Sequence, residues 1–124
     1  MTIAEVSKKY NLTQDTIRYY ERIGLIPRVP RTKSGVRNFD EESCRWLEFT
    51  KCMRNAGLPI EVLIEYINLS KEGDKTLEQR KNLLIEQRQK LIEKQENIKE
   101  TISRLDYKIE NYDKIAKGKK KDNN

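Results

Sequence analysis

The apolar residues among the first 25 positions recur at helical spacing in two short segments. Three of them mark one face of a helix over residues 3–10: Ile3, Val6 and Tyr10. A second helix begins after Thr13, a favourable N-cap, and ends at Gly24, which suits the left-handed turn that closes a helix. Two short helices joined by so few residues predict a helix-turn-helix, whose second helix enters the major groove of DNA.

The second of these helices is amphipathic. Ile17 and Tyr20 can turn inward, which leaves a basic outer face made by Arg18, Tyr19 and Arg22. Guanidinium groups and a phenol suit phosphates and base edges in a DNA groove. The alternative interpretation is an ordinary core helix whose basic face is merely solvated.

Residues 26–39 lose the helical spacing. Pro27 and Pro30 block a helix, the apolar residues partly alternate, and Lys33-Ser34-Gly35 is a turn signal. We therefore predict a two-stranded wing. Four cations on it could grip a DNA backbone beside the basic helix: Arg28, Arg31, Lys33 and Arg37. A solvated hairpin without a DNA contact is the alternative.

Two further helices complete the predicted N-terminal domain. Asp40 caps the first of them and Gly57 ends it, while Pro59 stands where the first turn of the next helix tolerates proline. Together the four helices can close a small but viable core.

A heptad repeat fills the C-terminal part of the chain. One apolar row recurs every seven residues: Leu77, Leu84, Leu91, Ile98, Leu105 and Tyr112. The row four positions later is charged or polar at first, with Lys81 and Arg88, and then apolar, with Ile102 and Ile109. A parallel pair would set like charges against each other at the seam, so the pattern favours an antiparallel dimeric coiled coil. A lone helix folded back on its own domain is the alternative.

The predicted fold class is therefore mainly α, a winged helix-turn-helix followed by a long antiparallel coiled-coil dimerisation helix. Thr76 and Gln79 have capping-box spacing at the start of that helix. The predicted segments are a DNA-binding domain, a polar linker, the coiled coil and a disordered basic tail, over residues 1–70, 71–75, 76–116 and 117–124.

Composition narrows the function. The formal net charge is +6, and the first 40 residues hold eight Lys and Arg against four Asp and Glu, so an acidic partner is expected. The absence of histidine removes the usual general base and most zinc sites, and predicts a protein that is not an enzyme and needs no cofactor or metal. Cys44 and Cys52 lie about 12 Å apart along a helix, too far for a disulfide. With no signal peptide and no membrane-spanning run, a cytoplasmic protein with free thiols is expected.

The segment Thr16-Ile17-Arg18-Tyr19-Tyr20-Glu21, with Gly24-Leu25-Ile26, Arg31 and Gly35-Val36-Arg37-Asn38-Phe39-Asp40 at their spacing, resembles the MerR family of bacterial transcription regulators. The resemblance spans the whole chain. Two positions depart from the family pattern. Asn11 replaces a common turn glycine, and Phe39 replaces a wing tyrosine, so a phenol contact to phosphate is lost there.

This resemblance implies a homodimer that binds a pseudo-palindromic promoter. Such a dimer distorts the spacer between the −35 and −10 elements so that RNA polymerase can engage both. No membrane partner is expected. The residues that the resemblance places on double-stranded DNA are Thr16, Arg18, Tyr19, Tyr20, Arg31, Lys33 and Arg37. Thr16 and Tyr20 fit this face more weakly, since Tyr20 can pack inward. The dimer contacts that the heptad pattern predicts are Leu77, Leu84, Leu91, Ile98, Ile102, Leu105, Ile109 and Tyr112.

The chain is similar to the short aldehyde- and electrophile-responsive branch of that family, the AdhR- and NmlR-like regulators. The resemblance implies that Cys52 is the responsive thiol, buried between the DNA-binding domain and the coil. An adduct there would change the angle between the two DNA-binding domains of the dimer. Lys51 and Arg54 favour a reactive thiolate there, whereas the nearby helix C-terminus disfavours it. Cys44 is expected to be structural. An effector-independent repressor or architectural DNA-binding protein, and a coiled-coil interaction module, are the alternatives.

Overall fold

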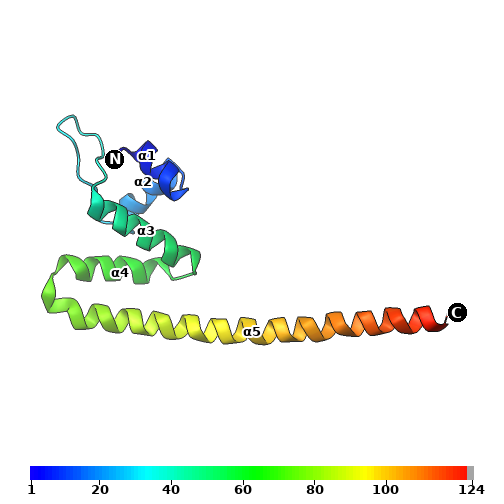
Figure 1. The fold of residues 1–124 in the computed structure, drawn as a ribbon. Coiled ribbons are helices and arrows are strands. Elements are labelled where there is room, and N and C mark those ends of the chain that lie inside the picture. The colour runs from blue at the N-terminus through cyan, green and yellow to red at the C-terminus, as the bar shows by residue number, and fades with distance from the viewer. Residues whose placement is uncertain (123–124) are drawn as a thin grey trace. The chain divides into compact units, whose positions relative to one another are not determined.

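The computed structural model describes residues 1–122 and is almost entirely helical (Figure 1). The helices are α1 (Ile3–Tyr10), α2 (Gln14–Ile23), α3 (Glu41–Asn55), α4 (Ile60–Lys71), a short 3₁₀ turn η1 (Asp74–Thr76) and α5 (Leu77–Asp122). The chain divides into two units. The first comprises residues 1–85, and the second contains the remainder of α5.

The helix-turn-helix predicted from the caps is confirmed. Thr2 and Glu5 form a reciprocal capping box at the start of α1, and the Thr13 hydroxyl accepts the Thr16 N–H at the start of α2. Asn11, in the turn between them, adopts a left-handed φ of 53°, a conformation that asparagine tolerates and in which it can replace glycine. Gly24 closes α2 with a φ of 84°. These caps set α1 against α2.

A single apolar core supports α2 from behind. Its most completely buried members come from the first four helices and from the segment after α2: Val6, Ile17, Leu25, Ile26, Val29, Phe39, Leu47, Leu63 and Ile67. Phe39, which departs from the expected wing tyrosine, is fully buried, so its ring belongs to this core. Burial of these side chains gives the short helices the stability that they lack alone.

The predicted two-stranded wing is wrong in detail. Residues 26–39 form an irregular hairpin in which the only bridge in the described part of the chain joins Arg31 to Arg37. The tip is closed by a hydrogen bond from the Gly35 N–H to the Thr32 carbonyl at 2.9 Å. Pro27 and Pro30 have no N–H to donate, which explains why the ladder does not extend toward the base of the hairpin.

Thr50 joins α3 to the end of α2. Its side chain is fully buried, and its hydroxyl donates to the Leu25 carbonyl at 2.7 Å. We expect Thr50→Val to lower the free energy of unfolding by about 1–3 kcal/mol, because it leaves that buried carbonyl without its donor. Urea denaturation measures the change. Thr101→Val removes the same atoms from an exposed position of α5 and should change stability little; equal losses in the two variants would contradict the assignment.

The turn before α5 differs from the predicted capping box. Thr76 is buried in η1, and its hydroxyl lies 2.6 Å from the Leu69 carbonyl and 2.9 Å from the Gly73 carbonyl. Arg80 completes the turn by donating to the Thr76 hydroxyl and to the Gly73 carbonyl, both at 3.0 Å. Thr76 therefore bonds backward to the end of α4, and the first turns of α5 are fastened to the first unit by side chains.

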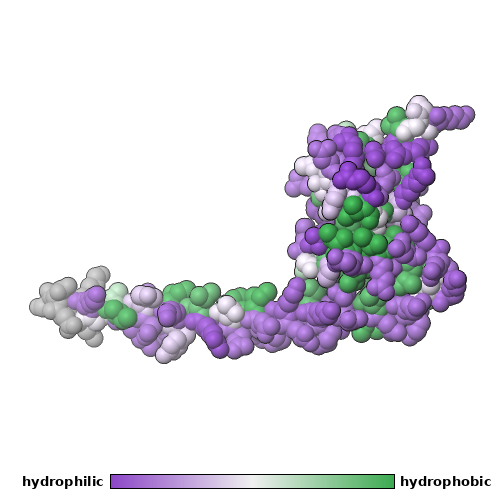
Figure 2. Space-filling view, turned by 180° about the vertical axis from the view of Figure 1, so that it is seen from behind, coloured by the Kyte–Doolittle hydropathy of each residue, from purple (hydrophilic) through white to green (hydrophobic). Residues whose placement is uncertain are grey.

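The helix α5 continues through Asp122. The predicted disordered tail from residue 117 is thus helical as far as 122, and residues 123 and 124 lie outside the described residues. Much of the predicted coiled-coil seam is exposed in the protomer: Leu77, Leu84, Ile98, Ile102, Leu105, Ile109 and Tyr112. Figure 2 shows apolar surface along one side of the extended part of this helix. Within the described residues, no helix has an apolar stretch long enough to traverse a bilayer.

Candidate nucleic-acid interface

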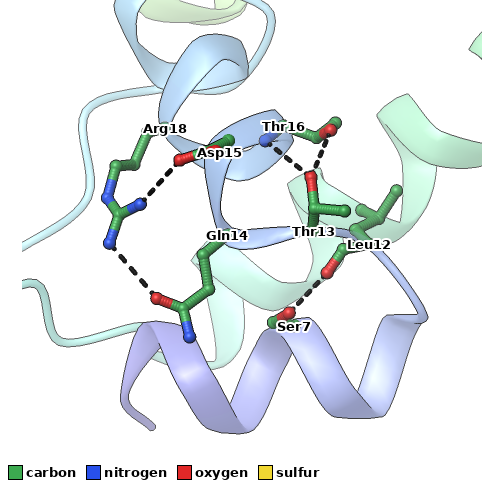
Figure 3. Close-up of polar contacts among 7 residues, drawn as sticks. All are labelled: Ser7, Leu12, Thr13, Gln14, Asp15, Thr16 and Arg18. Atoms are coloured by element: carbon green, nitrogen blue, oxygen red, sulfur yellow. Dashed lines mark hydrogen bonds and ion pairs between the residues drawn. The ribbon is translucent and has the colours of Figure 1, made fainter.

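The first turn of α2 carries a polar network around Arg18 (Figure 3). The Arg18 guanidinium donates to Asp15 Oδ1 at 3.1 Å and to Gln14 Oε1 at 3.2 Å. The Arg18 side chain is 43% exposed and that of Asp15 is 96% exposed. The predicted reading residue Arg18 therefore faces outward, but it is held by two neighbours that the sequence analysis did not include.

The other predicted contacts on α2 divide into two groups. Tyr19 is exposed, and the Arg22 guanidinium lies over its ring at 5.4 Å, a cation–π arrangement that orders both side chains. Thr16 is half-buried, and its hydroxyl lies 2.7 Å from that of Thr13. Tyr20 is buried in the core, so its role is packing, in line with the inward-facing alternative noted for it.

Glu21 fastens the wing to α2. Its side chain is only 9% exposed, and its carboxylate accepts from the Val29 N–H at 2.6 Å, from Arg37 Nε at 2.8 Å and from an Arg31 amino group at 3.2 Å. Arg31 and Arg37 are the bridged pair in the middle of the wing. One carboxylate therefore positions two predicted DNA contacts and the backbone that leads to them.

The environment of Glu21 favours its charged form. Burial alone would raise the pKa of this carboxyl, but the Val29 hydrogen bond and the guanidinium groups of Arg37 and Arg31 outweigh it, so the pKa lies below its usual value of 4.5. The carboxylate is thus ionised at neutral pH and neutralises part of the charge of both arginines.

The structure brings most of the predicted site residues together in the first unit. Arg18 and Tyr19 lie on α2, and Glu21 ties Arg31 and Arg37 to the same helix, while Arg28 and Lys33 are exposed on the wing. Sequence reasoning missed Glu21, Gln14 and Asp15. The available signal was the presence of two carboxylates, Asp15 and Glu21, on the same short helix as Arg18 and Arg22, since a carboxylate near arginines is a candidate partner for them.

The two thiols have different surroundings. Cys44 is buried in α3, whereas Cys52 is exposed, so the predicted burial of Cys52 is wrong for the protomer. Cys52 follows the buried Thr50 by two residues, which places it roughly 200° around the helix. Lys51 donates to the Tyr10 carbonyl, and Arg54 donates to the Leu58 carbonyl at 2.8 Å, so both cations expected to activate the thiol bind backbone oxygens.

A capped turn, a short helix with an outward basic face, and a hairpin tied beside it define a helix-turn-helix DNA-binding fold. The family model described as "MerR HTH family regulatory protein" matches residues 1–69. The chain therefore belongs to the MerR family of helix-turn-helix transcription regulators. The matched relatives are named as regulators, in agreement with the prediction that this protein is not an enzyme.

Three relatives are especially similar. The HTH-type transcriptional regulator AdhR of Bacillus subtilis is 61% identical over 93 residues, which are 75% of this chain and 66% of AdhR, so the match spans just under two thirds of AdhR. A crystal structure of a MerR-family regulator from Listeria monocytogenes is 52% identical, with a TM-score of 0.88 over 91% of this chain and 86% of that one. HiNmlR, a MerR-family regulator lacking the sensor domain and bound to promoter DNA, is 30% identical, with a TM-score of 0.80 over 91% of this chain and 90% of that one.

Proposed function

We propose that two copies of this chain bind promoter DNA together, with one α2 and one wing from each copy against the duplex. The observation that carries this proposal is the Glu21 cluster, which holds two wing arginines beside the basic helix. Cations presented by two elements can contact phosphates on both sides of a groove. HiNmlR, which is similar over 91% of this chain, is bound to promoter DNA.

The exposed row of α5 supports the dimer. Five apolar side chains between residues 98 and 112 are each more than half exposed in the protomer: Ile98, Ile102, Leu105, Ile109 and Tyr112. A seam of this length is expected to be covered by a second helix. The polar first half of the second row, which contains Lys81 and Arg88, favours an antiparallel partner. Each copy would then contribute one half-site contact on a pseudo-palindromic promoter.

DNA binding is tested with the duplex upstream of the protein's own gene. Binding of the fluorescently labelled duplex should weaken steeply as salt rises, because bound phosphates release counterions. Arg18→Ala should weaken binding by about 1–3 kcal/mol through the loss of a groove contact. Arg104→Ala, which removes an exposed arginine of α5, is the matched control. Equal affinities for Arg18→Ala and the wild type would remove Arg18 from the interface.

Regulation would follow from distortion of the bound DNA. A dimer whose two DNA-binding domains lie at a fixed spacing can bend and untwist the DNA between two promoter elements. This distortion changes how the two elements are aligned for RNA polymerase. In this proposal Cys52 controls that geometry by reacting with an aldehyde or related electrophile. One observation supports Cys52 over Cys44: its thiol is exposed in the protomer, whereas that of Cys44 is buried. The similarity to AdhR supports the choice of an aldehyde or related electrophile as the class of effector.

The sensing proposal predicts a thiol-dependent change in transcription. We expect methylglyoxal to change the output of an in vitro transcription reaction from the upstream promoter, and we expect Cys52→Ala to abolish that change. Cys44→Ala, which removes the buried thiol, should keep the response. An output that is indifferent to methylglyoxal in every variant, with DNA binding intact, would favour the effector-independent repressor or architectural protein.

A further inference from the structure

The first turn of α2 holds the Arg18 guanidinium from two directions. Its two terminal amino groups each donate one hydrogen bond, one to Asp15 at 3.1 Å and one to Gln14 at 3.2 Å (Figure 3). Arginine has five N–H donors, so three remain for an external acceptor. The two bonds fix the side chain before any DNA arrives, which reduces the entropy lost when a fork of two donors meets a base.

The position of these residues favours base edges as the external partner. Residues at the N-terminal end of a recognition helix are those that reach the bases in the major groove. An arginine fork matches the O6 and N7 acceptors of guanine. Asp15 differs from every other predicted contact because its carboxylate is repelled by phosphates. In the major groove its natural partners are the amino groups of cytosine and adenine.

We propose that Gln14 and Asp15 determine the sequence specificity of this protein. Together they hold Arg18 for a guanine edge, and Asp15 also accepts from the amino group of a cytosine or adenine in a neighbouring base pair. This inference rests on the proposed function, because it requires α2 to enter the major groove. It adds an anionic, selective element to a surface whose other charged contacts are cations.

A carboxylate in this place has a recognisable effect on binding. On the correct sequence it gains one hydrogen bond. Where another base places an acceptor or a methyl group at that point, the carboxylate loses its partner and opposes binding. Removing its charge should therefore strengthen binding to arbitrary DNA while weakening discrimination, whereas loss of a merely structural residue would weaken binding to all sequences alike.

The test compares full-length wild type, Asp15→Asn, Gln14→Ala and a matched charge control, Glu61→Gln, whose side chain is exposed on α4. Each protein selects from a library of duplexes with a randomised core, and the enriched sites are sequenced. Each also binds one fixed random-sequence duplex at constant salt. Circular dichroism melting confirms that each variant is folded.

We expect the wild type to enrich a two-fold symmetric site. In Asp15→Asn the preference for the favoured base over the others at one position in each half-site should fall about tenfold. This variant should also bind the random duplex a few-fold more tightly because one negative charge is gone. Gln14→Ala should weaken the guanine preference without strengthening random binding. Glu61→Gln should match the wild type.

Unchanged base preferences in folded Asp15→Asn would overturn the inference while leaving the proposed function intact. Weaker binding by Asp15→Asn to every sequence alike would also overturn it, because that result indicates a structural role. If the wild type binds no duplex, or binds without sequence preference, the proposed function fails and this inference fails with it.

Discussion

Replacing Glu21 with alanine is expected to lower the free energy of unfolding by about 2–4 kcal/mol, because it strands a buried N–H and separates two guanidinium groups from their shared carboxylate. The Val29 N–H donates to Glu21 at 2.6 Å, and Val29 itself is buried. Urea denaturation measures the loss. Glu61→Ala, which removes an exposed carboxylate from α4, should change stability by less than about 0.5 kcal/mol.

The same substitution should weaken binding to the upstream duplex by about tenfold at physiological salt. Two effects oppose each other here. Removal of a negative charge favours DNA, but Arg31 and Arg37 then have to be ordered on binding, at about 0.5–1.5 kcal/mol for each side chain. We expect ordering to dominate, because the lost charge is screened by salt and by the two arginines. Unchanged or tighter binding by a folded Glu21→Ala protein would show that the tether does not position the wing.

Glu21 also makes stability dependent on pH in the acidic range. Its pKa in the folded protein lies below the value of 4.5 that it has when exposed. The stabilisation is therefore fully present above about pH 4.5 and is lost as the pH falls through the folded-state pKa. Glu21→Gln cannot titrate at this position, so its stability should fall less steeply than that of the wild type below pH 4.5. Parallel curves for the two proteins would contradict the sign or the size of this shift.

The second large effect is expected at the proposed seam of α5. Ile102 is 52% exposed in the protomer, and its row would be covered by the second copy. Ile102→Asp would bury a carboxylate in that seam and should weaken dimerisation by roughly a hundredfold or more. Sedimentation velocity at micromolar concentration should then show a monomer. Affinity for a two-half-site duplex should fall strongly, because the two DNA-binding units are no longer linked.

Ser103→Asp is the matched control for this variant. It introduces the same charge one position later, on the exposed outer face of the heptad, and should remain dimeric. Spin labels at residue 81 distinguish the direction of pairing, since they lie close together in a parallel pair and far apart in an antiparallel one. A wild-type protein that is monomeric at these concentrations would remove the dimer from the proposal and would favour a helix without a coiled-coil partner.

Much of the domain could be predicted from local signals. Thr2, Thr13 and Asp40 each cap a helix where the sequence predicts one, and Gly24 closes α2 in the left-handed conformation. These signals act over a few residues, through side chain to backbone hydrogen bonds and steric limits on φ, so they are readable without the fold. The basic outer face of α2 follows from helical periodicity for the same reason.

The errors arise where several groups compete for one side chain or one segment. Thr76 has capping-box spacing, but its hydroxyl bonds to the carbonyls of Leu69 and Gly73 because α4 ends beside it. The wing has alternating residues but forms one bridge, since its base is organised by Glu21 and by prolines rather than by a ladder. Cys52 is exposed because the buried face of α3 runs through Cys44, Leu47 and Thr50.

By itself the sequence determined the helices, their caps, the basic face of α2 and the long apolar repeat of α5, because each depends on neighbours within one or two turns. Only the tertiary structure decided that Glu21 joins α2 to the wing and which thiol is accessible. The Glu21 bonds reach up to 16 positions along the chain, and pairing at that separation depends on how the core sets the elements against each other. Side-chain exposure is likewise a property of the packed domain. Helical spacing places Gln14 and Asp15 within reach of Arg18, but it allows several rotamers for each side chain, and the structure shows the set that forms the two hydrogen bonds.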